Sequence, residues 1–114
     1  MNEAKRTETE IQKDIVQVLE SVGILIMRNN TGRVKAVGGG WMNLGIPGGS
    51  DLIGMLKNGR FLAIEVKALG KYPTADQKAF LKRVNDGGGL GFVARTIEDV
   101  TFRIFREMNE VRKK

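Results

Sequence analysis

The spacing of apolar residues predicts three helices. Between residues 7 and 22, apolar side chains recur three and four positions apart, which gathers them on one helical face. The same spacing returns in residues 74–84 and again after residue 96. Each segment begins with a threonine suited to cap a helix: Thr7 or Thr9, Thr74 and Thr96.

Short runs of apolar and β-branched residues predict the strands. Residues 24–27 and 90–94 form two of them, and residues 51–57 and 61–67 form a hairpin around Asn58-Gly59. The hairpin strands are apolar on both faces over most of their length, which is typical of central strands covered by helices. We therefore expect one domain of 114 residues with a mixed α/β fold, a small central sheet flanked by helices in the order αβββαβα.

A glycine-rich stretch over residues 32–49 interrupts this pattern. Residues 34–37 could form a short strand, and the remainder is expected to be a loop. Loops of this length inside small domains are usually functional or disordered. Trp41 lies in this stretch, where it either packs in the core or against a second copy of the chain, or stacks on an exposed DNA base.

The composition excludes several kinds of chemistry. The chain has no cysteine and no histidine, so it cannot build a Cys/His zinc site, a cysteine nucleophile or a Ser-His-Asp triad. Any metal site must use oxygen ligands, as Mg²⁺, Mn²⁺ and Ca²⁺ prefer. The net charge of +6 favours a polyanionic partner such as nucleic acid. The lack of cysteine and of a long apolar run favours a cytoplasmic protein that does not enter a membrane.

Three charged residues around the hairpin carry the candidate chemistry. Asp51 follows a Pro-Gly-Gly turn, and Glu65 and Lys67 stand two apart in the second strand, so these two project to the same face. Two carboxylates beside an ammonium group form a site for a hard divalent cation, which can activate water and clamp a phosphate. An ordinary ion pair is the simpler interpretation of Glu65 and Lys67, but charges that directly follow a buried run need a reason.

The length of the hairpin turn decides whether Asp51 joins this pair. A two-residue turn at Asn58-Gly59 sets Asp51 opposite Val66, on the face away from Glu65. A three-residue turn with a bulge shifts the pairing by one residue and brings the carboxylates together. We expect either this shift or a position of Asp51 ahead of the regular ladder.

Asp51, Glu65 and Lys67 match the signature of PD-(D/E)xK nucleases, with Gly49-Ser50-Asp51 in place of the proline-containing element. More narrowly, the chain resembles the VRR-NUC (virus-type replication-repair nuclease) family over residues 8–100. The motifs that carry this resemblance are Glu8-x-x-Ile11-Gln12, Arg28-Asn29-Asn30-Thr31-Gly32, Gly45-Ile46-Pro47-Gly48-Gly49-Ser50-Asp51-Leu52, Ile64-Glu65-Val66-Lys67, Thr74-x-x-Gln77 and Gly91-Phe92-Val93-Ala94.

The resemblance implies a restriction-endonuclease-like core and a Mg²⁺- or Mn²⁺-dependent DNA endonuclease. Stand-alone members of this size resemble Holliday-junction resolvases and tend to be phage-encoded homodimers, which implies four-way junctions as substrate and the host cytoplasm as location. The resemblance also implies that Asp51, Glu65 and the Val66 carbonyl bind the metal and that Lys67 is catalytic. Glu8 would add a carboxylate, through water or on a second metal, and Gln77 would lie near the site.

Several of these residues have simpler roles open to them. Glu8 suits the positive end of the helix dipole, and Gln77 is placed to complete a capping box with Thr74. Asn29 and Asn30 are expected to be turn residues. The basic residues that either contact DNA phosphates or simply face solvent are Arg28, Arg33, Lys35, Lys71 and Lys78.

Two other functions stay open at this point. The chain could be a catalytically silent, nuclease-like module that binds DNA, and metal binding distinguishes that case. It could also be a nuclease for linear duplexes or DNA ends, which a comparison of four-way junctions with duplexes would separate from a resolvase.

Overall fold

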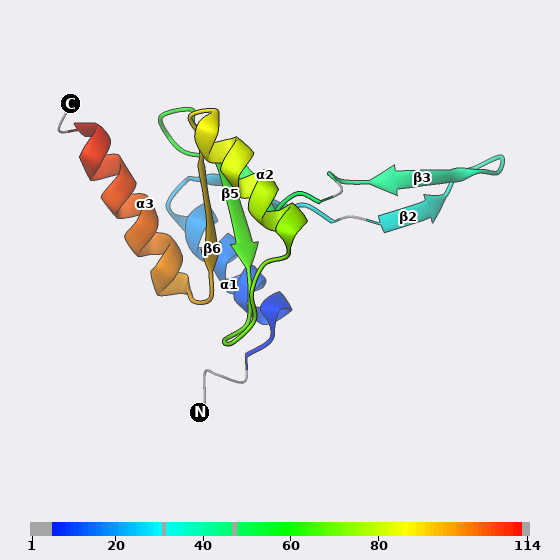
Figure 1. The fold of residues 1–114 in the computed structure, drawn as a ribbon, viewed down its shortest axis with the longest axis horizontal. Helices are drawn as coiled ribbons and strands as arrows, with labels where there is room; N and C mark the ends of the chain where they lie inside the picture. The colour runs from blue at the N-terminus through cyan, green and yellow to red at the C-terminus, as the bar shows by residue number, and fades with distance from the viewer. Residues whose placement is uncertain (1–5, 31, 47, 113–114) are drawn as a thin grey trace.

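The structure, a computed structural model, describes residues 6–30, 32–46 and 48–112. The helices are α1 (Glu8–Ser21), α2 (Ala75–Asp86) and α3 (Ile97–Arg112). The strands are β1 (Leu25–Arg28), β2 (Gly32–Lys35), β3 (Trp41–Leu44), β4 (Leu52–Met55), β5 (Phe61–Val66) and β6 (Leu90–Ala94) (Figure 1).

The central sheet is mixed and has the strand order β1-β4-β5-β6. The pairs β1–β4 and β4–β5 are antiparallel, whereas β5 and β6 are parallel and are joined through α2. In Figure 1, α2 lies in front of β5 and α1 lies behind it. The expectation of a mixed α/β fold with helices flanking a small sheet is confirmed, and β4 and β5 are its central strands.

The largest apolar cluster lies between the sheet and the helices α1 and α3. Leu62, Ile64 and Val66 of β5 are completely buried in it, because alternate strand residues point to the same face. Residues from both helices pack against them, including Ile11, Ile15, Leu19, Val100 and Ile104. The even-numbered side of β5 therefore belongs to the core.

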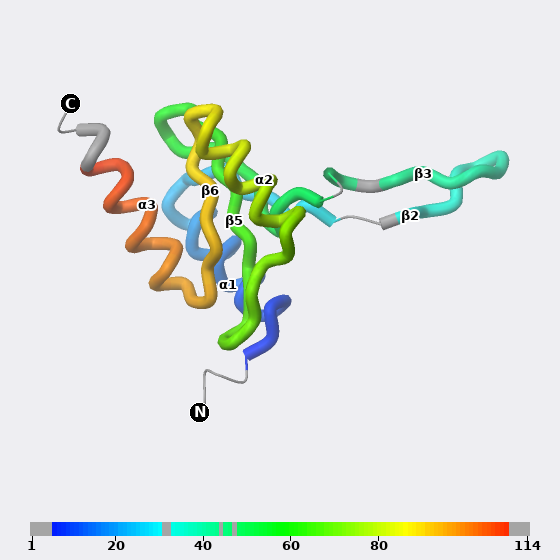
Figure 2. Tube along the Cα trace, in the orientation of Figure 1, coloured from blue at the N-terminus to red at the C-terminus, as the bar shows by residue number. Residues whose placement is uncertain are grey.

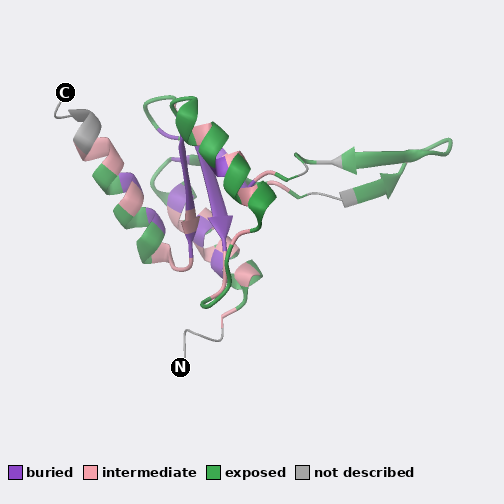
Figure 3. Cartoon of the chain, viewed as in Figure 1, coloured by how far each residue is buried: buried purple, intermediate pink, exposed green. Residues whose placement is uncertain are grey.

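The odd-numbered side of β5 faces α2. A Cβ atom added at Gly91 of β6 would lie 3.2 Å from the side chain of Leu81 in α2. Gly91 pairs with Ala63 and Val93 pairs with Glu65, so these residues share the face that α2 covers. Figure 3 shows β5 buried along most of its length. Glu65 thus lies in a second, smaller layer, on the far side of the sheet from the main core.

The helices begin where the sequence predicts. Thr7 forms a capping box with Glu10, and Thr74 forms one with Gln77. At the start of α3, the amide of Asp99 donates to the Thr96 hydroxyl at 3.1 Å. In the part of the chain that the structure describes, none of the helices is long and apolar enough to cross a membrane.

The strands β2 and β3 form an arm that projects from the body (Figure 2). The molecule is accordingly elongated, with extents of 54, 38 and 29 Å. Gly38, Gly39 and Gly40 all have positive φ and turn the chain, so that residues on either side pair from Gly32↔Leu44 to Lys35↔Trp41. The prediction of a loop is therefore wrong for residues 32–33 and 41–44, because the glycines build the tip of a hairpin, and the short strand expected at residues 34–37 is observed at residues 32–35.

Candidate active site

The turn between β4 and β5 contains three residues, 57–59. The amide of Leu56 donates to the carbonyl of Arg60 at 2.9 Å and closes the turn. Gly59 has a φ of +90°, and the amide of Arg60 donates to the side-chain oxygen of Asn58 at 3.1 Å. This is the three-residue hairpin turn in which glycine takes the left-handed position.

The turn brings Asp51 and Glu65 to one face of the sheet. Leu52 pairs with Ile64, one residue away from the register that a two-residue turn would impose. Asp51 directly precedes the first residue pair of this ladder, and the same register continued by one residue sets it opposite Glu65. The predicted one-residue shift is confirmed, and the two carboxylates are cross-strand neighbours.

Asp51 is fixed by hydrogen bonds to the main chain. Its Oδ2 accepts from the amide of Val66 at 2.9 Å, and its carbonyl accepts from the amide of Asn29 at 2.8 Å. The N–H and C=O of one strand residue point to the same side, so the Val66 carbonyl is also directed to the Asp51 side of β5. Asp51, Glu65 and the Val66 carbonyl thus gather at the end where β4 begins and β5 ends.

Glu65 is a buried carboxyl group that lacks hydrogen-bond partners. Its side chain is 1% exposed, and neither carboxylate oxygen has a partner among the described residues. Burial and, to a smaller extent, the neighbouring negative charge of Asp51 together raise the pKa of Glu65 to about 7, although the Lys67 ammonium opposes this rise. Such a group is costly unless a cation or a proton neutralises it.

Lys67 supplies the nearest positive charge. Its Nζ lies 3.7 Å from Oε2 of Glu65, which is an ion pair rather than a hydrogen bond, and its side chain is 14% exposed. Its amide donates to the carbonyl of Ala94 at 3.0 Å and holds the residue beside β6. Lys67 therefore reaches the Glu65 carboxylate from the rim of the site.

Glu8 lies at the same end of β5 but is held differently. Its Oε2 accepts from the amide of Ala68 at 3.0 Å, which ties the start of α1 to the segment after β5. Among the described residues no three acidic side chains lie close enough together to hold a metal ion by themselves. Metal ligation by Glu8 therefore stays a prediction, whereas its contact with the Lys67–Ala68 segment is observed.

Asn29 is a structural residue of the site that the sequence did not reveal. Its Nδ2 donates to the carbonyls of Ile46 and Ser50, each at 3.1 Å, and its Oδ1 accepts from the amide of Ile46 at 2.8 Å. These bonds fasten the segment before Asp51 to the end of β1. The expectation of an ordinary turn residue is wrong, because the partners lie 17 and 21 positions away and leave no local signal.

Replacing Asn29 with alanine is expected to destabilise the protein by about 1–3 kcal/mol, because three hydrogen bonds are lost and main-chain groups lose their partners. The measurement is the free energy of unfolding in urea. Asn30→Ala is the matched control, since Asn30 is an exposed neighbour of the same residue type, and its effect is expected to stay within about 0.5 kcal/mol. Equal stability of the two variants would contradict the role of Asn29.

The remaining candidates lie at the end of β1, on the arm, after β5 and in α2. The Gln77 Oε1 accepts from the amide of Thr74 at 2.8 Å, so its observed contact is the capping box. The basic candidates are exposed in the structure: Arg28, Arg33, Lys35, Lys71 and Lys78. Trp41 is 62% exposed on the arm, which contradicts packing in the core. Pro47 lies outside the described residues.

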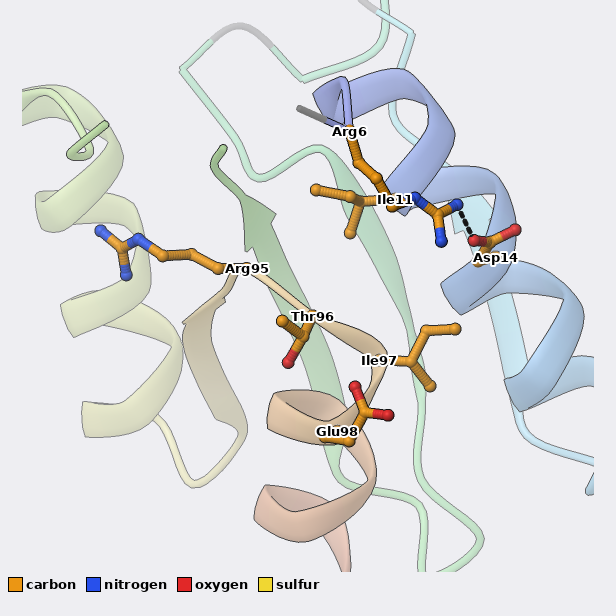
Figure 4. A pocket seen from close by; sticks show the side chains of 7 residues that line it. All are labelled: Arg6, Ile11, Asp14, Arg95, Thr96, Ile97 and Glu98. Atoms are coloured by element: carbon orange, nitrogen blue, oxygen red, sulfur yellow. Dashed lines mark hydrogen bonds and ion pairs between the residues drawn. The ribbon is translucent and has the colours of Figure 1, made fainter. Parts of the chain in front are cut away.

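A small cavity of about 80 Å³ lies between the start of α1 and the segment that joins β6 to α3, and neither Asp51 nor Glu65 lines it. It is bordered by an ion pair between Arg6 and Asp14 and by the start of α3 (Figure 4).

Comparisons with protein-family models, with curated proteins and with solved structures gave no match.

Proposed function

We propose that this chain is a metal-dependent DNA endonuclease. The observation that carries the proposal is the Glu65 carboxyl group, which is 1% exposed and has no hydrogen-bond partner among the described residues. It is flanked by the Asp51 carboxylate and the Lys67 ammonium. A buried carboxylate next to a second carboxylate is destabilising by itself, and a bound divalent cation removes that cost. This arrangement is more easily explained by metal binding than by structural need.

The donor set fits Mg²⁺ or Mn²⁺. Asp51 and Glu65 offer carboxylate oxygens, and the Val66 carbonyl is directed to the same side of β5. These three groups would hold the ion, with water completing its coordination. When bound, such an ion supplies an activated water and neutralises charge on a phosphate.

The other steps of the reaction would depend on side chains of the protein. Asp51 and the main chain around it hold the site in place through the Val66 amide. Lys67, at the partly exposed rim, would contact the scissile phosphate or its attacking water and stabilise the charge that develops there. Glu8 would act on the site indirectly, by holding the segment after Lys67 through its hydrogen bond with the Ala68 amide.

The substrate and assembly follow from the charge and the resemblance. The net charge of +6 favours binding to the phosphate backbone, which is independent of base sequence. The resemblance to VRR-NUC nucleases favours a restriction-endonuclease-like core, a branched DNA such as a four-way junction, and a homodimer. Two sites related by two-fold symmetry would suit the cutting of two strands.

Cleavage of a labelled four-way junction, with a linear duplex of matched sequence beside it, tests the proposal. We expect cutting with Mg²⁺ or Mn²⁺, none in chelator, and a preference for the junction. The Lys67→Ala chain, purified in the same way, controls for contaminating nucleases. Binding of DNA without cutting under either metal would replace the proposal by a silent binding module, and equal cutting of the duplex would favour a duplex or end-processing nuclease.

A further inference from the structure

The arm formed by β2 and β3 has two different faces. Lys35 pairs directly with Trp41, and Arg33 pairs with Asn43, so these four side chains lie on one side of the two-stranded ribbon. Val34 and Met42 pair on the other side. One face is thus basic and aromatic, and the other is apolar.

The basic face presents an exposed indole that is held in position. The guanidinium of Arg33 lies 5.2 Å from the centre of the Trp41 ring, a cation–π contact. Trp41 is nevertheless 62% exposed. A large aromatic ring kept in solvent, on a two-stranded ribbon that is only marginally stable by itself, indicates that something covers it.

The charge of this region favours a polyanion as the covering partner. Residues 21–50 contain no aspartate or glutamate, while Arg28, Arg33 and Lys35 lie within them. All three basic side chains are exposed. A protein partner of ordinary mixed charge would not need this segregation, whereas a nucleic-acid strand matches both the positive charge and the flat ring.

The arm is also coupled to the carboxylate pair. Ile46, just beyond β3, is bonded to the Asn29 side chain, and the Asn29 amide is bonded to the carbonyl of Asp51. Trp41 is five residues from Ile46, a distance of at most about 17 Å along an extended strand. DNA held on the arm would therefore be positioned relative to Asp51 by a short, hydrogen-bonded path.

We propose that this face of the arm binds DNA near a branch point, with Trp41 stacked on an unpaired or exposed base and Arg33 and Lys35 on the adjoining phosphates. The inference rests on the proposed nuclease function and specifies which surface recognises the substrate. Stacking on an aromatic ring is tolerant of base identity, so the arm would select DNA shape rather than sequence.

Trp41 is the only tryptophan in the chain, so its fluorescence reports on the arm directly. In chelator, where no cleavage occurs, titration with a four-way junction is expected to quench this emission in a saturable manner. Trp41→Ala is expected to raise the Kd for the junction about 5- to 150-fold, which corresponds to the loss of one stacked base. Trp41→Phe should recover most of the affinity, and Phe105→Ala, at an aromatic residue 69% exposed on α3, should leave it unchanged.

The two basic residues are tested through salt dependence. Replacing Arg33 and Lys35 together with glutamine should reduce the slope of log Kd against log salt by about 1.8, because each phosphate contact contributes about 0.9. Lys57→Gln, in the exposed β4–β5 turn, is the control and should leave the slope unchanged.

Distinct outcomes separate this inference from the nuclease proposal. Unchanged Trp41 emission and an unchanged Kd for Trp41→Ala, together with normal metal-dependent cleavage by the wild type, would overturn the role of the arm and leave the nuclease standing. A change from dimer to monomer in Trp41→Ala by sedimentation, with no quenching by DNA, would assign the arm to a second copy of the chain and would also overturn it. Quenching without cleavage under any metal would support the arm and contradict the nuclease.

Discussion

Replacing Lys67 with alanine is expected to slow cleavage of a four-way junction by about 100- to 1,000-fold, because the substitution removes a positive charge where negative charge develops on the reacting phosphate. The side chain is 14% exposed, so it lies at the boundary between the buried Glu65 carboxylate and solvent. In that position its loss should affect the chemical step more than the binding of DNA. The measurements are single-turnover cleavage rates and the junction Kd in chelator.

The control for Lys67→Ala is Lys57→Ala. Both variants lose one positive charge, but Lys57 is exposed in the turn at the other end of the β4–β5 hairpin. Lys57→Ala should cleave at the wild-type rate. If the two variants lost activity equally, Lys67 would act only through the general charge of the protein, and if Lys67→Ala kept full activity, the assignment of the catalytic lysine would be wrong.

The Glu65→Gln variant is expected to lose cleavage by about 1,000-fold or more while becoming more stable in the absence of metal. The activity falls because a neutral amide is a poor ligand for Mg²⁺. The stability rises because the wild-type protein must bury a carboxylate without hydrogen-bond partners among the described residues. A residue that destabilises the fold and is needed for activity is the pattern expected of a functional site.

The gain in stability should depend on pH. The pKa of Glu65 rises from 4.5 to about 7 on folding. The contribution of Glu65 to wild-type stability is therefore greatest below pH 4.5 and is lost as the pH rises through 7. The difference corresponds to as much as about 3 kcal/mol. Urea unfolding in chelator at pH 5 and pH 8 should show this decline in the wild type and its absence in Glu65→Gln.

The same unfolding measurements are repeated with added metal and with a matched control variant. Mg²⁺ or Mn²⁺ at pH 8 should restore stability to the wild type but not to Glu65→Gln, because only the carboxylate binds the ion. Glu20→Gln, at an exposed position on α1, should behave like the wild type throughout. A wild-type stability that is the same at pH 5 and pH 8, with or without metal, would contradict both the buried carboxylate and the metal site.

The parts of the fold that depend on local sequence were predictable. Thr74 and Gln77 form a capping box because their spacing is fixed by one helical turn, and the same holds for Thr96 and Asp99. The meeting of Asp51 with Glu65 was predictable only as one of two hairpin registers. The left-handed conformation of Gly59 in a three-residue turn decided between them.

The parts that depend on distant contacts were not predictable. The bonds from Asn29 reach Ile46 and Ser50, and no residue near Asn29 signals them. The complete burial of Glu65 depends on how α2 packs against the sheet. The amphipathic pattern of α2 does not specify that packing. The pairing of β2 with β3 was not predicted because each strand has only four residues and the glycines that join them also favour a loop.

The arm is an insertion between two strands that are already neighbours. Arg28 at the end of β1 pairs with Leu52 at the start of β4, so a tight turn could join them and leave the sheet intact. Each residue pair added to or removed from the ribbon would change its length by about 3.3 Å without moving Asp51. On the proposed function, the length of the arm would set the reach along DNA independently of the chemistry at Asp51, and an engineer could vary the two separately.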